Sequence, residues 1–212
     1  MSNKQQDEIE DWKCYHEIGH GIIAHIFDGY LYNFEKVTFN IKSKKLHADD
    51  EGYTIAMPVV NYEQVILANL FSASLIDGLY LLSGIAGASF FGSSNAALAN
   101  ELSFSNFKSI LNYNGSKGDF DIILRANRPY GRMLYTIQGL TEDESDVIHF
   151  KLFQILKKLF IKEEIAIGIP ALFLKLKKNK ELLPSDFQRA FDAAFADTVK
   201  QEMFYRLTEE RF

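Results

Sequence analysis

Apolar and close-packing residues recur at a period near 3.6 between positions 9 and 27 of the chain. This period is typical of a helix with one buried face. The pair Asp28–Gly29 follows, and glycine can take the left-handed conformation that ends many helices. We therefore predict a first helix that stops near Asp28, with an acidic run in its first turns, where the helix dipole favours negative charge. The periodic positions are Ile9, Trp12, His16, Gly19, His20, Ile23 and Phe27, and the acidic ones are Asp7, Glu8, Glu10 and Asp11.

Strict alternation replaces this period in two later segments, Lys36–Ile41 and Gly52–Val59. Alternation is the pattern of a strand with one buried face, so the two segments predict a small β-hairpin around a charged loop at Lys42–Asp50. Such a strand can accept an extended peptide by strand addition, or it can simply cover the core, and the pattern leaves both open. The alternating apolar residues are Val37, Phe39 and Ile41 in the first segment and Tyr53, Ile55 and Met57 in the second.

The longest apolar run, Val65–Phe91, is long enough for a membrane-spanning helix, which needs about 20 mostly apolar residues. It contains Asn69 and, in its middle, Asp77–Gly78, which would be costly in lipid. We interpret it as one or two buried helices, near Tyr62–Phe71 and Leu75–Phe90, without stable membrane insertion. A membrane-associated protein is the alternative.

The rest of the chain is mostly helical by the same criteria. We predict that a helix starts at Phe120–Arg125 and that Asn127–Gly131 forms a turn. Further helices are predicted at 142–160, 165–177 and 185–201, the last capped by Ser185. His149 is expected to be structural. In the helix predicted at 142–160, the periodic apolar residues are Val147, Phe150, Phe153, Ile155 and Leu156.

Composition narrows the class of protein. Hydrophobic residues make up 47% of the 212, enough for a sizeable core in one domain, and a net charge of −5 argues against a nucleic-acid partner. The single cysteine, Cys14, excludes an internal disulfide and suits a reducing compartment. With no apolar signal segment at its start and no G-x-x-x-x-G-K-[ST] loop, we expect a cytoplasmic protein without an ATPase site of its own.

The most specific chemical signature is the stretch H-E-I-G-H at residues 16–20, which fits the zinc peptidase motif H-E-x-x-H. On a helix, His16 and His20 lie on one face and can offer two imidazoles to one zinc ion, whereas an ordinary helix with two histidines is the alternative. Glu17 projects about 100° round from His16, where a general base should sit. Ile26 stands where the longer motif H-E-x-x-H-x-x-G-x-x-H has its third histidine, and His25 lies about 180° from His16, so the third ligand must come from elsewhere.

From about residue 10 to residue 130 the chain resembles the peptidase domain of FtsH, the membrane-anchored, ATP-dependent zinc protease. The family pattern A-Y-H-E-A-G-H-A corresponds to C-Y-H-E-I-G-H-G at residues 14–21, and its G-Y-T…P to residues 52–58. Its L-L-G-G-R-A-A-E-E…F-G corresponds to residues 81–92, where Ile85, Gly87, Ala88 and Ser89 replace the charged stretch. Its G-A-S-N-D corresponds to residues 115–119, and a weaker echo of its terminal E-T-L-x-G-x-E-F lies at residues 181–187.

The resemblance implies a mainly α-helical, zincin-like FtsH-type peptidase domain over residues 1–212, with a core at 7–130 and a C-terminal helical part at 131–212. It also implies that Asp119 is the third zinc ligand, with Asp121 as the nearest rival. We therefore expect a zinc-dependent metalloendopeptidase that hydrolyses flexible or unfolded polypeptides without ATP. The alternative is a zinc-binding regulatory or interaction module of the same fold, suggested by the replaced charges. The resemblance leaves open whether the chain forms a homo-oligomer or works with a separate ATPase partner.

Overall fold

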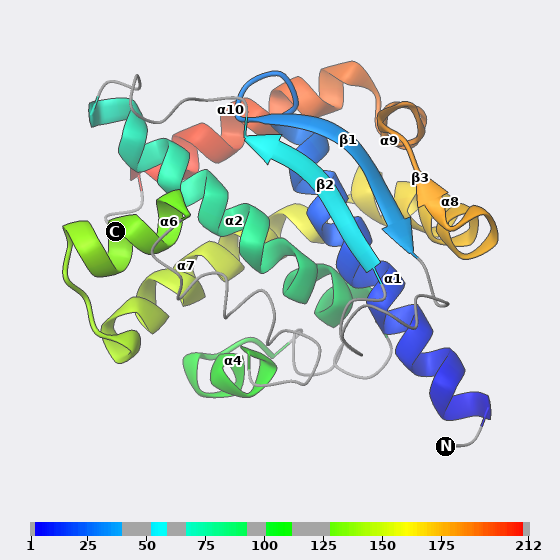
Figure 1. Ribbon diagram of the computed structural model, residues 1–212, viewed down its shortest axis with the longest axis horizontal. Coiled ribbons are helices and arrows are strands. Elements are labelled where there is room, and N and C mark those ends of the chain that lie inside the picture. Colours follow the sequence, from blue (N-terminus) through cyan, green and yellow to red (C-terminus); the bar gives the residue numbers. More distant parts are fainter. Residues whose placement is uncertain (1–2, 40–51, 59–66, 93–100, 112–127, 210–212) are drawn as a thin grey trace.

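The computed structural model describes residues 3–39, 52–58, 67–92, 101–111 and 128–209, which are mainly helical with one small antiparallel sheet (Figure 1). This confirms the predicted mainly α class with a β-hairpin. The elements in chain order are α1 (Asn3–Ile26), β1 (Tyr32–Phe39), β2 (Gly52–Pro58), α2 (Leu67–Phe91), α4 (Phe104–Leu111), α6 (Pro129–Gly131), the π-helical turn η1 (Arg132–Ile137), α7 (Glu142–Phe160), α8 (Glu163–Asn179), β3 (Glu181–Leu182), α9 (Pro184–Ala190) and α10 (Ala193–Glu209).

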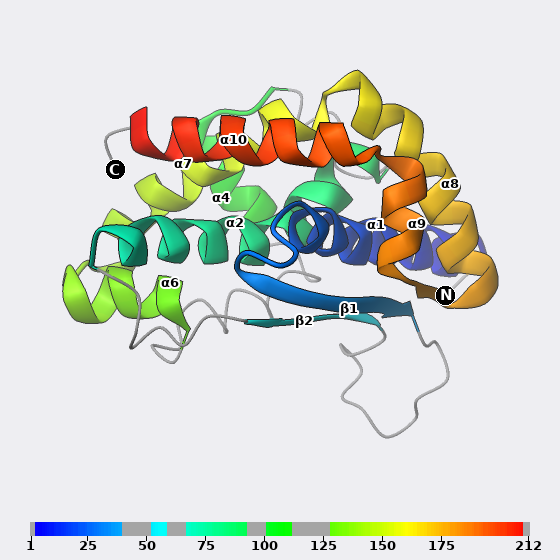
Figure 2. The ribbon, with the colours of Figure 1, turned by 90° about the horizontal axis from the view of Figure 1, so that it is seen from above.

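Helices α1 and α2 form the middle layer, with the sheet on one side and α10 on the other (Figure 2). Helix α1 ends at Ile26, and Gly29 has a φ of 70°, which confirms the predicted stop. The helix begins at Asn3, before the acidic run, so its first turn holds no acidic residue and that detail of the prediction is wrong.

Glycines let α1 and α2 approach closely. A Cβ atom on Gly19 of α1 would lie 2.1 Å from the carbonyl oxygen of Ser83, and one on Gly87 of α2 would lie 2.5 Å from the carbonyl oxygen of Tyr15. Real Cβ atoms do not come that near to backbone, so both positions need glycine. The close crossing brings the H-E-x-x-H motif against α2.

The apolar run forms one continuous helix over Leu67–Phe91, so of the one or two helices predicted there the structure has one. Among the described residues, only this helix is long and apolar enough to cross a membrane, and 89% of its apolar window, Phe71–Phe91, is buried inside the molecule. Its one acidic residue, Asp77, is fully buried. The apolar character of α2 is thus used in the core of the protein.

The sheet has the strand order β2-β1-β3, and both pairings are antiparallel. The predicted strands are confirmed, but β1 starts at Tyr32, four residues before the predicted start. A register shift falls between Phe34 and Lys36, which leaves Glu35 as an extra residue. This bulge moves the buried face from Tyr32 and Phe34 to Val37 and Phe39. Ile41 and the loop at 42–50 lie outside the described residues.

Helix α7 has the predicted bounds, and its start is a capping box in which Thr141 and Glu144 bond reciprocally. One of the apolar positions that define its predicted buried face is wrong, because Val147 is 48% exposed and its neighbour Ile148 is buried. Residues 129–131 form a helical turn, where the sequence predicted only a turn.

The helix predicted at 185–201 is in fact two helices, α9 and α10. Phe191 is extended between them, and the Asp192 side chain accepts a hydrogen bond from the Phe195 amide, 2.6 Å away. The predicted cap at Ser185 is also wrong, because Ser185 lies inside α9, after Pro184.

Candidate metal centre

The H-E-x-x-H histidines meet at one point on α1. His16 and His20 are buried, and their Nε2 atoms lie 3.2 Å apart. Two nitrogen ligands at 2.0–2.1 Å from a tetrahedral zinc ion lie about 3.3–3.4 Å apart. The pair therefore fits two corners of a zinc tetrahedron, although the same separation also suits a hydrogen bond between the two rings.

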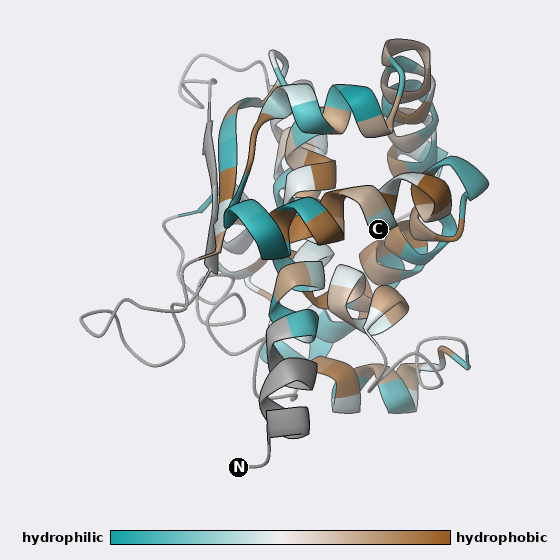
Figure 3. Ribbon diagram, turned by 90° about the vertical axis from the view of Figure 1, so that its right-hand side faces the viewer, coloured by the Kyte–Doolittle hydropathy of each residue, from teal (hydrophilic) through white to brown (hydrophobic). Residues whose placement is uncertain are grey.

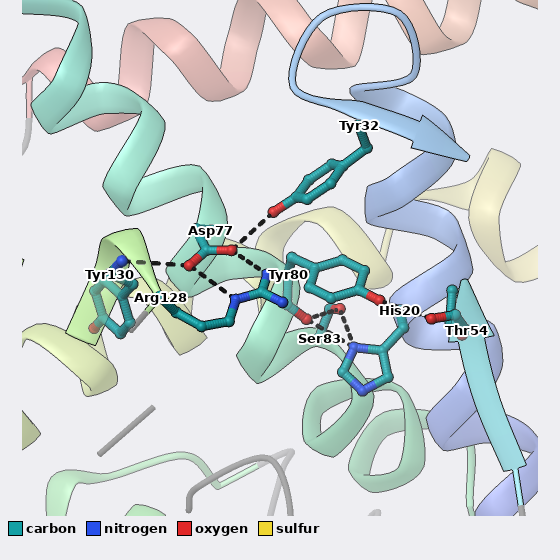
Figure 4. Close-up of polar contacts among 8 residues, drawn as sticks. All are labelled: His20, Tyr32, Thr54, Asp77, Tyr80, Ser83, Arg128 and Tyr130. Carbon is teal, nitrogen blue, oxygen red and sulfur yellow. Dashed lines mark hydrogen bonds and ion pairs between the residues drawn. The ribbon is translucent and has the colours of Figure 1, made fainter. Parts of the chain in front are cut away.

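The tautomer of His20 follows from its other nitrogen. Its Nδ1 lies 2.8 Å from the carbonyl oxygen of Tyr80, and a carbonyl can only accept, so Nδ1 carries the proton. Nε2 then carries a lone pair, as a metal ligand requires. The hydroxyl of Ser83 donates to the same carbonyl at 2.6 Å (Figure 4).

Gly84 of α2 lies opposite the Nε2 atoms of the two histidines. A Cβ atom at this position would be 2.4 Å from Nε2 of His20 and 2.6 Å from Nε2 of His16. A side chain on Gly84 would therefore clash with both Nε2 atoms. The space that glycine leaves there is consistent with a group bound between the rings.

Glu17, the residue after His16 on α1, is buried, at 7% exposure. Its carboxylate Oε2 accepts a hydrogen bond of 2.9 Å from the hydroxyl of Thr54, which also lies 3.2 Å from the Glu17 carbonyl oxygen. Thr54 belongs to β2. The strand therefore orients the carboxylate that the sequence predicts as general base.

Tyr80 contacts both His20 on α1 and Thr54 on β2. Its carbonyl holds His20, and its hydroxyl donates to the carbonyl oxygen of Thr54 at 3.3 Å. Sequence reasoning missed both Tyr80 and the role of Thr54. The G-Y-T segment marked Thr54 without giving it a function, and no side-chain pattern could reveal a role for the backbone carbonyl of Tyr80.

An ion pair with a buried carboxylate lies one turn before Tyr80 on α2 (Figure 4). Asp77 pairs with Arg128 and accepts hydrogen bonds from the Tyr130 amide and the Tyr32 hydroxyl, each at 3.3 Å. Burial alone would lower the pKa of Arg128, but the charge of Asp77 and its hydrogen bonds raise it. The guanidinium also lies over the ring of Tyr80, 5.6 Å from its centroid, so the pair supports the residue that orients His20.

Two other histidines, His25 and His149, pack against aromatic rings. His25 packs against Phe187 with ring centroids 5.8 Å apart, and burial lowers its pKa. His149 is fully buried, with its ring 5.6 Å from that of Tyr130 and its Nδ1 3.6 Å from Asp146. Neither contact involves His16 or His20.

The third ligand stays a prediction. Asp119 and Asp121 both lie outside the described residues. Within the described ranges, no group of three His, Cys, Asp or Glu side chains is placed to hold a metal ion.

No protein-family model, curated protein or solved structure matches this chain. The resemblance to FtsH is carried by the motifs of the chain alone and stays a prediction.

Proposed function

We propose that the chain is a zinc-dependent peptidase with an FtsH-type peptidase domain. The observation that carries the proposal is the pair of Nε2 atoms of His16 and His20, 3.2 Å apart and facing Gly84. Glu17, the residue after His16, is buried and bonded to Thr54. His16 and His20 would hold the zinc ion, and Asp119 is our candidate for the third ligand.

The chemistry divides between the metal and the chain. Zinc, when bound, supplies a Lewis acid that polarises the scissile carbonyl and makes water more acidic. Glu17 accepts the proton of the attacking water. Because Thr54 already donates to Oε2, we assign proton uptake to Oε1. The Tyr80 carbonyl keeps His20 in the tautomer that binds metal.

The position of β2 supports a polypeptide substrate. β2 stands at one end of the sheet order, so one of its edges has no strand partner among the described residues. An extended peptide can pair with such an edge. Thr54 of β2 contacts Glu17 directly, so a peptide added to β2 would run close to the general base.

Metal analysis and a chelator test the proposal together. We expect the purified chain to contain about one zinc per molecule and to cleave casein or unstructured peptides until a chelator removes the metal. Glu17→Gln should keep the zinc and reduce cleavage by about 10²-fold or more, because only the proton acceptor is lost. A protein without zinc whose cleavage survives Glu17→Gln would overturn the mechanism.

A second candidate is a zinc-binding regulatory or interaction module without turnover. It is favoured by α2, where the family's charged stretch is replaced and Ile85, Ala88 and Ser89 are buried at 1% exposure or less. Such a module would bind zinc and a partner but would cleave no peptide. Chelator-sensitive turnover decides for the enzyme, and zinc without turnover decides for the module.

A further inference from the structure

Helix α8 leaves one apolar face exposed. Ile167 and Leu174 are 70% and 67% exposed, and Pro170 and Ala171 between them are exposed as well. Residues spaced by three, four or seven positions share one side of a helix, so these four form a continuous stripe. In Figure 3, which faces this side of the molecule, α8 is polar at both ends and mostly hydrophobic between them.

Opposite charges flank the stripe. Glu163 stands at the start of α8 and Lys178 near its end, and both are exposed on the side that carries Ile167 and Leu174. Neither forms an ion pair with another residue that the structure describes. The face is therefore acidic at one end, apolar in the middle and basic at the other end.

The exposed residues of α8 are arranged so that two antiparallel copies of the helix would match each other. Reading α8 backwards about the point between Pro170 and Ala171 exchanges Ile167 with Leu174 and Glu163 with Lys178. We propose that this stripe is a homodimer interface, in which α8 of one copy pairs antiparallel with α8 of a second copy. A two-fold axis between Pro170 and Ala171 would place each Ile167 on a Leu174 and each Glu163 opposite a Lys178.

The charges favour a second copy in this orientation. A parallel pair would place Glu163 against Glu163 and Lys178 against Lys178, which is repulsive. The opposite face of α8 is already packed, because Phe173 stacks on Tyr15 with ring centroids 4.5 Å apart and Gly168 lies against Phe191. The exposed stripe is thus the part of α8 that is open to a partner.

The interface would be small. One helix stripe on each copy buries less than the ~1,600 Å² of a standard protein interface. We therefore expect a weak dimer with a micromolar dissociation constant, visible by sedimentation only at high protein concentration. The inference does not depend on peptidase activity.

The first test is the concentration dependence of sedimentation for the full chain and two variants. Leu174→Asp should weaken the dimer about tenfold or more by placing a charge in the apolar stripe. Ile137→Asp is the matched control, because Ile137 is 62% exposed on η1, outside the stripe, and it should leave the dimer unchanged. A protein that stays monomeric at about 1 mM, or a dimer that Leu174→Asp leaves intact, would overturn the proposal.

The second test uses the two-fold symmetry. Glu163→Lys and Lys178→Glu should each weaken self-association about fivefold, because each homodimer gains two like-charge pairs. Mixing the two variants should restore a dimer at least as strong as that of the wild type, since both charge pairs are then attractive. The exposed Glu101, outside α8, supplies a control in Glu101→Lys. Failure of the mixture to associate would rule out the antiparallel arrangement, and association only with another protein would assign the stripe to that partner instead.

Discussion

Gly84 is the residue on which the candidate centre depends most directly without being a ligand. Because the missing side chain leaves room beside both Nε2 atoms, we expect Gly84→Ala to lose zinc binding in the folded protein. Its new Cβ atom would lie within 2.6 Å of both Nε2 atoms. Zinc content per folded molecule, with folding followed by circular dichroism, measures the effect.

The control for Gly84→Ala is Gly78→Ala on the same helix. A Cβ atom on Gly78 would lie 2.7 Å from the ring of Tyr130, so this variant is also strained, but away from the histidines. It should lower stability and retain zinc in the folded fraction. Equal zinc loss in both variants would show that Gly84 matters only for folding.

Thr54 offers a second prediction at the scale of the residue. Thr54→Val removes the hydroxyl that holds Glu17 at 2.9 Å but keeps the shape of the side chain. A hydrogen bond to a charged group contributes about 1.5–3 kcal/mol, so kcat/KM should fall about tenfold or more while zinc content stays the same. Thr54→Ser keeps the hydroxyl and should retain most of the activity; a similar loss in both variants would argue against the hydrogen bond.

At the scale of the element, Asp186 joins α8 to α9. Burial alone would raise the pKa of Asp186, but the Leu183 amide, Lys175 and Arg189 outweigh this effect and lower it below its ordinary value of 3.8. A lowered pKa in the folded state means that the unfolded chain takes up the proton first as pH falls. The stabilisation is therefore present above about pH 4 and is lost as pH falls through the folded value.

Asp186→Asn should remove this pH-dependent stabilisation. Because Lys175 and Arg189 are partly exposed to solvent, we expect the variant to lose about 1 kcal/mol at pH 7 and to approach the wild type below about pH 4. Urea unfolding at pH 7 and at pH 3 measures both values. Asp143→Asn, at a residue that is 93% exposed, is the control and should change little at either pH. A difference that grows at low pH would contradict the assignment.

The elements that the sequence predicts best are those with an unbroken period. Helix α7 has the predicted bounds because its apolar face and its acidic start agree. The start of β1 was missed because the bulge at Glu35 changes which positions are buried. The sequence also suggested one helix across Phe191, whose apolar side chain continues the period although its backbone is extended.

The candidate site also contains residues that the sequence predicts and one that it does not. His16, Glu17 and His20 could be predicted because their spacing is chemical and local to one helix. Tyr80 could not, because it acts on His20 through a backbone carbonyl 60 positions away. Such a contact depends on how α1 and α2 cross, which neither helix reveals alone.

At the scale of the whole molecule, the proposed substrate is a flexible chain. The 212 residues contain no phosphate-binding loop of the P-loop type, and pairing with β2 needs free backbone groups that a folded protein seldom offers. We expect the protein to cleave a disulfide-containing protein after reduction and alkylation, to leave its native form intact, and to be indifferent to ATP.

The test compares cleavage of the native and the alkylated form of one protein, each with and without ATP. Equal cleavage of both forms without ATP would contradict the prediction. Cleavage that requires an added ATPase would instead favour a separate unfolding partner.

The place of β3 in the chain has a consequence for biosynthesis. Lys36 of β1 reaches Glu181 of β3 across 145 residues, and Asp11 of α1 reaches Lys177 across 166. On the ribosome, the H-E-x-x-H motif is therefore made long before the segments that complete its surroundings. Contacts between such distant segments slow folding and leave apolar surface open in the meantime. A nascent chain should thus lack the complete candidate centre, and depend on chaperones, until α8 and β3 have been made.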